Sequence, residues 1–301
     1  MLPAARVIGS ALILVSAGLP GIAGGAKPIQ GEYLVRGDGV VAATVGGVPG
    51  RMRITPWAPA APTLNPDYAQ RIGLRGGLFG FSVKVGPVKV RGESGVTRLQ
   101  FGNASFKRRV VWFERRYDAG ADGAVGPGGL PVDLIRFQLK PAGAGERTAT
   151  LPLVQQIFRP AMTRVVVGGR TISILFDPQH PRTLATAGAG AALAEALGGQ
   201  LVGNGDKAEI AFGVTRPVRT IRLARPLVVG PLTLESMLVR VADNGSVAGI
   251  ADADADPDEI VVTAKSKKDR RDVIIIGRDQ LGGCSSILFD KKAKAIRLSC
   301  V

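Results

Sequence analysis

A pattern that occurs twice limits the possible folds of this chain more than any other feature of its sequence. The strings VGGVPGRMRITPW at residues 45–57 and VGGRTISILFD at residues 167–177 each join a Gly-Gly turn to an apolar strand. Each continues to a Thr-Leu pair, at residues 63–64 and 183–184, and then to a helix-like stretch, at residues 65–74 and 188–197. Such self-similarity indicates two copies of one structural unit. Aligning the two Thr-Leu pairs without a gap places Trp57 opposite Asp177.

The two copies also end alike, with DGAVGPGGL at residues 122–130 and VIIIGRDQL at residues 273–281. Gly126 lies 69 residues after Trp57, whereas Gly277 lies 100 residues after Asp177. The polar stretch at residues 243–272 accounts for most of the difference, and we interpret it as an insertion. We therefore expect an N-terminal lobe at residues 27–150 and a C-terminal lobe at residues 151–301.

The composition favours strands over helices in both lobes. The 301 residues include 41 Gly and 20 Pro but only 5% aromatic residues, which is typical of many short strands joined by turns. Apolar and polar residues alternate over residues 81–90, 96–101, 109–113, 218–223 and 227–241. The prediction is an all-β protein with two similar lobes around a cleft and a few short helices.

The charge and the scarce ligating residues limit the partners and cofactors. Lys and Arg number 39 against 24 Asp and Glu, a net charge of +15, and a basic surface attracts nucleic acid, anionic headgroups or acidic proteins. The basic residues are mostly scattered and no nucleic-acid-binding motif occurs, so we predict no nucleic-acid partner and at most a peripheral membrane contact. One His and two Cys exclude a His-rich metal site and a four-thiolate zinc site, and we expect no metal and no cofactor.

Residues 1–26 have the pattern of a secretory signal peptide. One Arg precedes an apolar stretch at residues 7–17, and small residues follow it. We therefore expect an exported protein, periplasmic or secreted. Cys284 and Cys300 flank two alternating strands whose midpoint lies at the turn between them, so their sulfurs should face each other. An oxidising compartment favours a disulfide between them, and the alternative is two reduced thiols in a small core.

The order of these elements resembles a known family. Their order is similar to that of the aspartic proteases of the retropepsin and pepsin type, here in a two-lobed bacterial form. It is a strand, a short loop, Thr-Leu, a helix, further strands, two apolar residues with Gly, and then Leu. The closest local match is IIGRDQL at residues 275–281 with ILFDKKAKAIRL at residues 287–298. The resemblance implies an Asp-Thr-Gly or Asp-Ser-Gly loop in each lobe, with two carboxylates that share one proton.

The sequence departs from that catalytic pattern in both lobes. Asp177 remains as a catalytic remnant, but Pro178 replaces the hydroxyl residue and Gln179 replaces the Gly, and residues 45–65 contain no Asp or Glu. Asp177 is otherwise interpreted as an ordinary turn residue before proline. We expect a catalytically inactive protein that binds a peptide or protein in the interlobe cleft, with Trp57 and His180 beside Asp177 on its floor.

Two alternatives remain. The first is an active aspartic-type endopeptidase with a divergent site, in which Asp122 or Asp279 supplies the second carboxylate. The second is an envelope protein that docks to a cell-envelope partner through a strand resembling the TonB box of outer-membrane receptors, which could equally be an ordinary exposed strand. That docking strand comprises Glu259, Ile260, Val261, Val262 and Thr263.

Overall fold

The computed structural model describes residues 31–77, 80–242, 245–252 and 272–301. Strands dominate this part of the chain, and its α-helices are three and short, which confirms the all-β prediction. None of the described helices has the length and apolar character needed to cross a membrane. The predicted signal peptide at residues 1–26 lies outside the described residues, as does most of the predicted insertion at residues 243–272.

The first half of the chain forms a seven-stranded sheet in the order β2-β3-β8-β4-β7-β6-β5. Its strands are β2 (Val40–Val45), β3 (Val48–Ile54), β4 (Thr63–Leu64), β5 (Phe81–Val85), β6 (Val88–Phe101), β7 (Ala104–Phe113) and β8 (Gly123–Val125). Helix α1 (Pro66–Ile72) packs onto it through the buried Tyr68, whose hydroxyl donates to the Val48 carbonyl at 2.8 Å. The short 3-10 helix η1 (Pro127–Gly129) follows β8.

The second half forms a nine-stranded sheet in the order β11-β12-β13-β19-β14-β17-β16-β15-β18. Its strands are β11 (Val154–Gln156), β12 (Arg159–Val167), β13 (Arg170–Phe176), β14 (Leu184–Ala185), β15 (Gly199–Ala211), β16 (Val214–Val229), β17 (Leu232–Arg240), β18 (Ala251–Asp252) and β19 (Val273–Ile276). Helix α2 (Ala187–Leu197) begins where the Thr186 hydroxyl accepts the Ala189 N–H, and it ends at Gly198 with φ 73°. Helix α3 (Arg278–Leu281) follows β19.

The two halves contain the same arrangement of paired strands. In the first half β3 runs parallel to β8, and β4 pairs antiparallel with β8. In the second half β13 and β14 make the same two pairings with β19. Both Gly-Gly pairs occupy two-residue hairpin turns at positive φ, at residues 46–47 and 168–169, a conformation that glycine adopts without strain.

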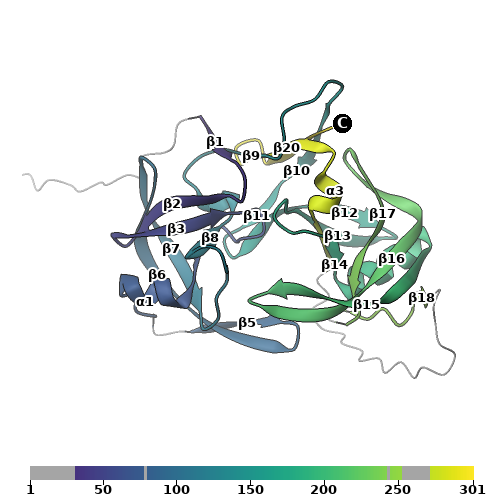
Figure 1. The fold of residues 1–301 in the computed structure, drawn as a ribbon, viewed down its shortest axis with the longest axis horizontal. Coiled ribbons are helices and arrows are strands. Elements are labelled where there is room, and N and C mark those ends of the chain that lie inside the picture. Colours follow the sequence, from purple (N-terminus) through teal and green to yellow (C-terminus); the bar gives the residue numbers. More distant parts are fainter. Residues whose placement is uncertain (1–30, 78–79, 243–244, 253–271) are drawn as a thin grey trace, which may run out of the picture.

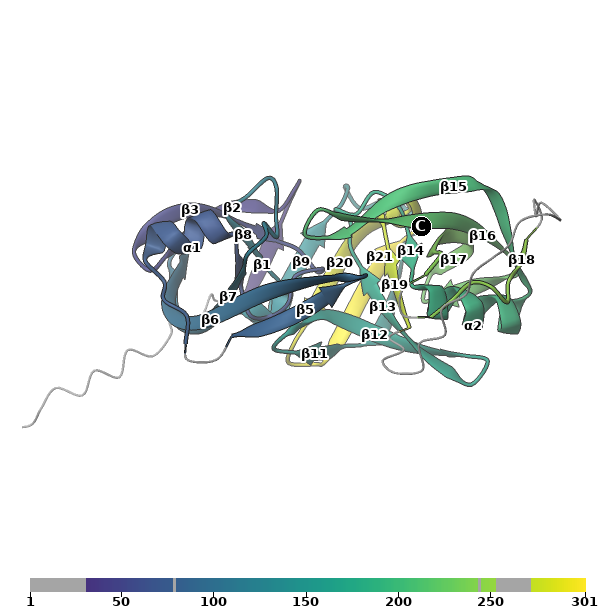
Figure 2. The same ribbon diagram turned by 90° about the horizontal axis from the view of Figure 1, so that it is seen from below.

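A third sheet joins the two halves. Its five strands lie in the order β1 (Glu32–Val35), β9 (Leu134–Gln138), β20 (Cys284–Asp290), β21 (Ala295–Cys300) and β10 (Arg147–Pro152). The C-terminal hairpin β20–β21 therefore lies between strands of the first half, and Figure 2 shows it in the middle of the molecule. Strand β10 runs across the lobe boundary predicted at residues 150 and 151.

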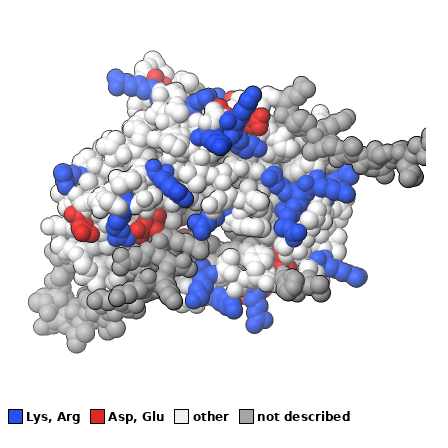
Figure 3. Space-filling view, turned by 180° about the vertical axis from the view of Figure 1, so that it is seen from behind, with Lys and Arg blue, Asp and Glu red and all other residues white. Residues whose placement is uncertain are grey.

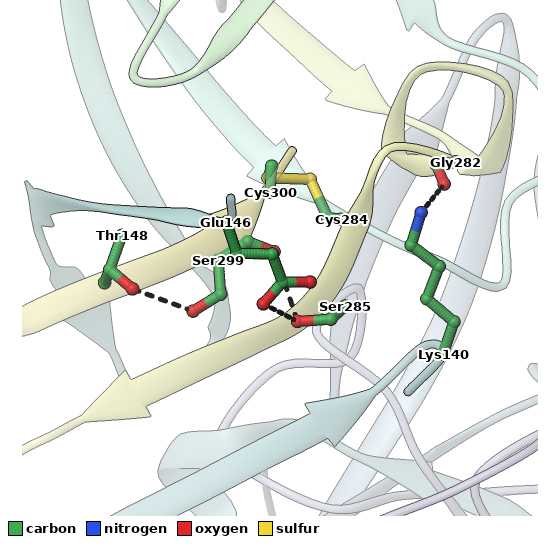
Figure 4. Close-up of a disulfide and its surroundings, with 8 residues drawn as sticks. All are labelled: Lys140, Glu146, Thr148, Gly282, Cys284, Ser285, Ser299 and Cys300. Carbon is green, nitrogen blue, oxygen red and sulfur yellow. Dashed lines mark hydrogen bonds between the residues drawn. A yellow bond between two sulfur atoms is a disulfide. The ribbon is translucent and has the colours of Figure 1, made fainter. Parts of the chain in front are cut away.

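The disulfide predicted within this hairpin is present. Cys284 and Cys300 face each other across β20 and β21, and both are almost fully buried. Figure 4 shows two side-chain hydrogen bonds beside it, from Ser285 to Glu146 at 2.8 Å and between Thr148 and Ser299 at 3.0 Å. The bridge thus closes the hairpin at the sheet that the halves share.

Candidate active-site remnant and apolar cavity

The loops after β3 and β13 are equivalent in their backbone hydrogen bonds. The Thr55 N–H donates to the Val125 carbonyl at 3.1 Å, and the Asp177 N–H donates to the Ile276 carbonyl at 2.9 Å. Three residues further on, the Ala58 N–H donates to the Thr55 carbonyl just as the His180 N–H donates to the Asp177 carbonyl. Thr55 and Asp177 therefore occupy the same position in the two repeats.

Their side chains also make equivalent contacts. The Thr55 hydroxyl accepts the Trp57 N–H at 3.3 Å, and the Asp177 carboxylate accepts the Gln179 N–H at 3.1 Å. The two side chains meet, because Thr55 Oγ1 lies 3.4 Å from Asp177 Oδ1 and donates to it. A hydroxyl thus lies beside Asp177 at the repeat-related position.

This register corrects the alignment of Trp57 with Asp177. Strand β4 begins at Thr63 and its counterpart β14 begins at Leu184, so Thr183 is not equivalent to Thr63. The first loop is also one residue longer than the second. A gapless alignment on the Thr-Leu pairs is therefore displaced by two residues at the candidate site.

Asp177 is buried, with 5% of its surface exposed. Burial raises the pKa of its carboxyl, and this effect outweighs the opposing effects of the Gln179 N–H, of His180 and of the Thr55 hydroxyl. Proton sharing between two carboxylates would need a second acid at the position of Thr55. Here Asp177 faces a hydroxyl that does not titrate in the usual pH range.

Proline follows both equivalent residues, as Pro56 and Pro178, so neither loop offers a hydroxyl or a backbone N–H at that position. Gln179 instead connects the two halves. Its side-chain amide donates to the carbonyl of Asp38 at 2.9 Å and to that of Ile54 at 3.2 Å. The Gln179 side chain thus connects the loop after β13 to the end of β3.

The two alternative carboxylates have partners of their own. Asp279 accepts hydrogen bonds from both the backbone N–H and the hydroxyl of Thr183. Asp122 accepts the Arg51 N–H and pairs with Arg71 at 2.7 Å. Neither is among the groups that shift the pKa of Asp177.

An apolar cavity of about 710 Å³ lies beside these loops, with walls from both halves. Trp57, Pro59 and Tyr117 from the first half line it, together with strand β5. The second half contributes residues of β12, β14, β19 and the β15–β16 hairpin, among them Phe212. This volume is within the usual range for small-ligand sites. Of the three residues predicted on the floor, Trp57 is among the lining residues, whereas Asp177 and His180 are not.

Phe212 closes one side of the cavity from the tip of the β15–β16 hairpin, which reaches from the second half toward the first (Figure 1). Its ring lies edge-on to Phe113 at 4.8 Å and to Tyr117 at 5.3 Å between centroids. The Tyr117 hydroxyl donates to the Trp57 carbonyl at 3.4 Å, and burial raises the pKa of this phenol. These aromatic contacts connect the cavity to the loop of Thr55.

His180 and the docking strand complete the predicted sites. The Nδ1 of His180 lies 2.5 Å from the Arg182 carbonyl, so the ring is held within its own loop. The docking strand, Glu259 to Thr263, lies outside the described residues. On the face in Figure 3, Lys and Arg form several separate groups rather than one continuous patch.

Thr55, Tyr117 and Phe212 are not among the site residues predicted from the sequence. The signal for Thr55 is the shared proline, because an apolar strand leads to Thr-Pro at residues 55–56 and to Asp-Pro at residues 177–178. No local pattern marks Tyr117 or Phe212, since they meet only through the packing of the two halves.

Comparison with protein-family models and with curated proteins finds no match for this chain. Among the described residues, no group of three or more His, Cys, Asp or Glu side chains is arranged to hold a metal ion.

Proposed function

We propose that this chain is an aspartic-protease-like protein without hydrolytic activity, and that it binds a peptide in the cavity between its two halves. The observation that carries the proposal is the contact of Thr55 with Asp177. An acid–base pair for peptide hydrolysis needs one group to accept a proton from water while the other donates one to the substrate carbonyl. A threonine hydroxyl does not act as the second group of such an acid–base pair.

Three further features support the family and the binding role. The equivalent loops follow strands with the same pairings, the two halves share a central sheet, and the glycines after β8 and β19 are equivalent. The cavity is mainly apolar with a few polar groups, which is typical of binding sites. The buried disulfide is compatible with an oxidising compartment, so we include export to the periplasm or the medium in the proposal.

The experiment measures binding and cleavage on the same sample. A mixture of unfolded apolar peptides is incubated with the full chain from acid to neutral pH, binding is followed by fluorescence polarisation, and products are sought by mass spectrometry. We expect saturable binding of peptides that stay intact. Cleavage that Asp177→Asn abolishes would establish the enzyme instead, and failure to bind any peptide would also overturn the proposal.

A further inference from the structure

Aromatic side chains are concentrated around the cavity. Six of the fifteen Phe, Trp and Tyr residues in the chain line it. They are Trp57, Phe81, Phe113, Tyr117, Phe158 and Phe212. Because they come from distant segments of both halves, their gathering is a property of the fold and not of one aromatic stretch of sequence.

Two of these rings are accessible at the cavity. Phe158 is 61% exposed and Phe81 is 37% exposed, although both are large apolar residues. Phe81 also lies edge-on to Phe113, with 5.4 Å between ring centroids. An incoming aromatic ring can pack edge-on against such rings, as Phe212 already does against Phe113.

The charged residues of the lining are all basic. They are Lys84 on β5, Arg159 at the start of β12 and Arg240 at the end of β17, and no Asp or Glu is among the described residues that line the cavity. Lys84 and Arg159 are exposed, and neither forms a salt bridge with a described residue. Aromatic faces attract cations, but the positive charges of Lys84 and Arg159 oppose a cationic ligand and favour a carboxylate.

We infer that the cavity recognises an aromatic side chain with a neighbouring carboxylate. This inference rests on the proposed peptide-binding function and specifies its ligand as an aromatic, acidic peptide. The ring packs among Phe81, Phe113 and Phe158, while the carboxylate lies toward Lys84 and Arg159. The carboxylate comes either from an Asp or Glu next to the aromatic residue or from the C-terminus of the peptide.

Fluorescein-labelled peptides of equal length test the inference by polarisation with the full chain. The parent peptide has Phe next to Glu, and its relatives carry Gln or Lys for Glu, or Ala for Phe. We expect the parent to bind most tightly, and more weakly as salt is added. Parents with a free or an amidated C-terminus distinguish the two sources of the carboxylate.

Matched protein variants test which basic residues contribute to binding of the parent peptide. Lys84→Gln and Arg159→Gln should each weaken binding of the parent by about two- to five-fold, as expected for exposed ion pairs. Lys107→Gln removes an exposed charge from β7 outside the cavity and should leave affinity unchanged. An affinity that neither the replacement of Glu by Gln nor amidation of the C-terminus lowers would overturn this inference and leave peptide binding intact. Failure of every peptide to bind would overturn the proposed function itself.

Discussion

At the scale of single residues, the chemistry of the contact between the two repeats depends on one hydroxyl group and one carboxyl group. Thr55 and Asp177 have the same backbone hydrogen bonds and the same contact to the N–H two residues on. Only their side-chain chemistry differs. The hydroxyl of Thr55 stays protonated. The Asp177 carboxyl therefore titrates without a second acid at the equivalent position in the first half.

Asp177→Asn should change the pH dependence of stability. Burial raises the pKa of Asp177 in the folded protein, so the carboxyl contributes stability below its unfolded pKa and loses it as pH rises through the folded pKa. We expect the free energy of unfolding of the wild type to fall over that range, and the variant to be the more stable at neutral pH.

Urea unfolding at a series of pH values measures this difference. Asp67→Asn, at an exposed residue on α1, is the control and should show no such trend. If Asp177→Asn were instead less stable than the wild type at neutral pH, the stabilisation from hydrogen bonds to the carboxylate would exceed the cost of burying its charge.

At the scale of elements, the loop after β3 and the loop after β13 each pass very close to the backbone of a glycine. A Cβ on Gly126 would lie 2.1 Å from the Ala58 carbonyl oxygen, and one on Gly277 would lie 2.7 Å from the Arg182 carbonyl carbon. Both glycines stand directly after the strand that pairs parallel with β3 or β13. The repeated glycine is thus a packing requirement of each half.

Gly277→Ala should destabilise the protein by about 1–3 kcal/mol, because its Cβ meets backbone that must move. Chemical denaturation measures the change. Gly205→Ala is the matched control on β15, where a Cβ meets no atom within 4 Å. A similar cost at both positions would mean that the close approach at Gly277 relaxes freely.

The packing of the β15–β16 hairpin against the first half depends on the Phe212 ring at its tip. Phe212 has φ 56°, which is unfavourable for a bulky residue, yet its side chain is only 9% exposed. Phe212→Ala should cost about 3 kcal/mol of unfolding free energy, since it removes the packing and keeps the strained backbone.

Thermal or urea unfolding measures this cost. Phe212→Gly should be the less destabilising of the two variants, because glycine tolerates positive φ. Phe158→Ala, at an exposed ring of the same cavity, should change stability by less than about 0.5 kcal/mol. Equal effects at both phenylalanines would contradict an anchoring role for Phe212.

At the scale of the whole molecule, the shared sheet makes the two halves one folding unit. Strand β20 pairs with β9 of the first half, and β21 pairs with β10. One continuous core contains buried residues of both halves, including Phe137 and Phe289, whose rings lie 5.7 Å apart. Damage to the C-terminal hairpin therefore affects the whole protein.

Replacing Cys284 and Cys300 together by Ala should lower the unfolding free energy by about 3 kcal/mol, as expected for a disulfide that closes a loop of this length. Both halves should lose stability in a single transition. Calorimetry of the double variant, with the reduced wild type as the comparison, measures the effect. Unchanged stability, or two separate transitions, would contradict the role assigned to the hairpin.

Local sequence was enough to determine much of the fold. Alternating apolar residues specify the strands, the Gly-Gly pairs specify two hairpin turns, and a turn midway between Cys284 and Cys300 aligns them for a disulfide. These features depend on residues that are close in the chain. The recurrence of the pattern then predicts two similar units.

Only the tertiary structure decided which residues meet at the site. Thr55 lies beside Asp177, two residues from the position that the gapless alignment gives, and a shift of two residues leaves an alternating pattern unchanged. Phe212 likewise reaches Tyr117 only because a long hairpin crosses between the halves. Such contacts join residues far apart in the chain, so their geometry depends on how whole sheets pack rather than on neighbouring residues.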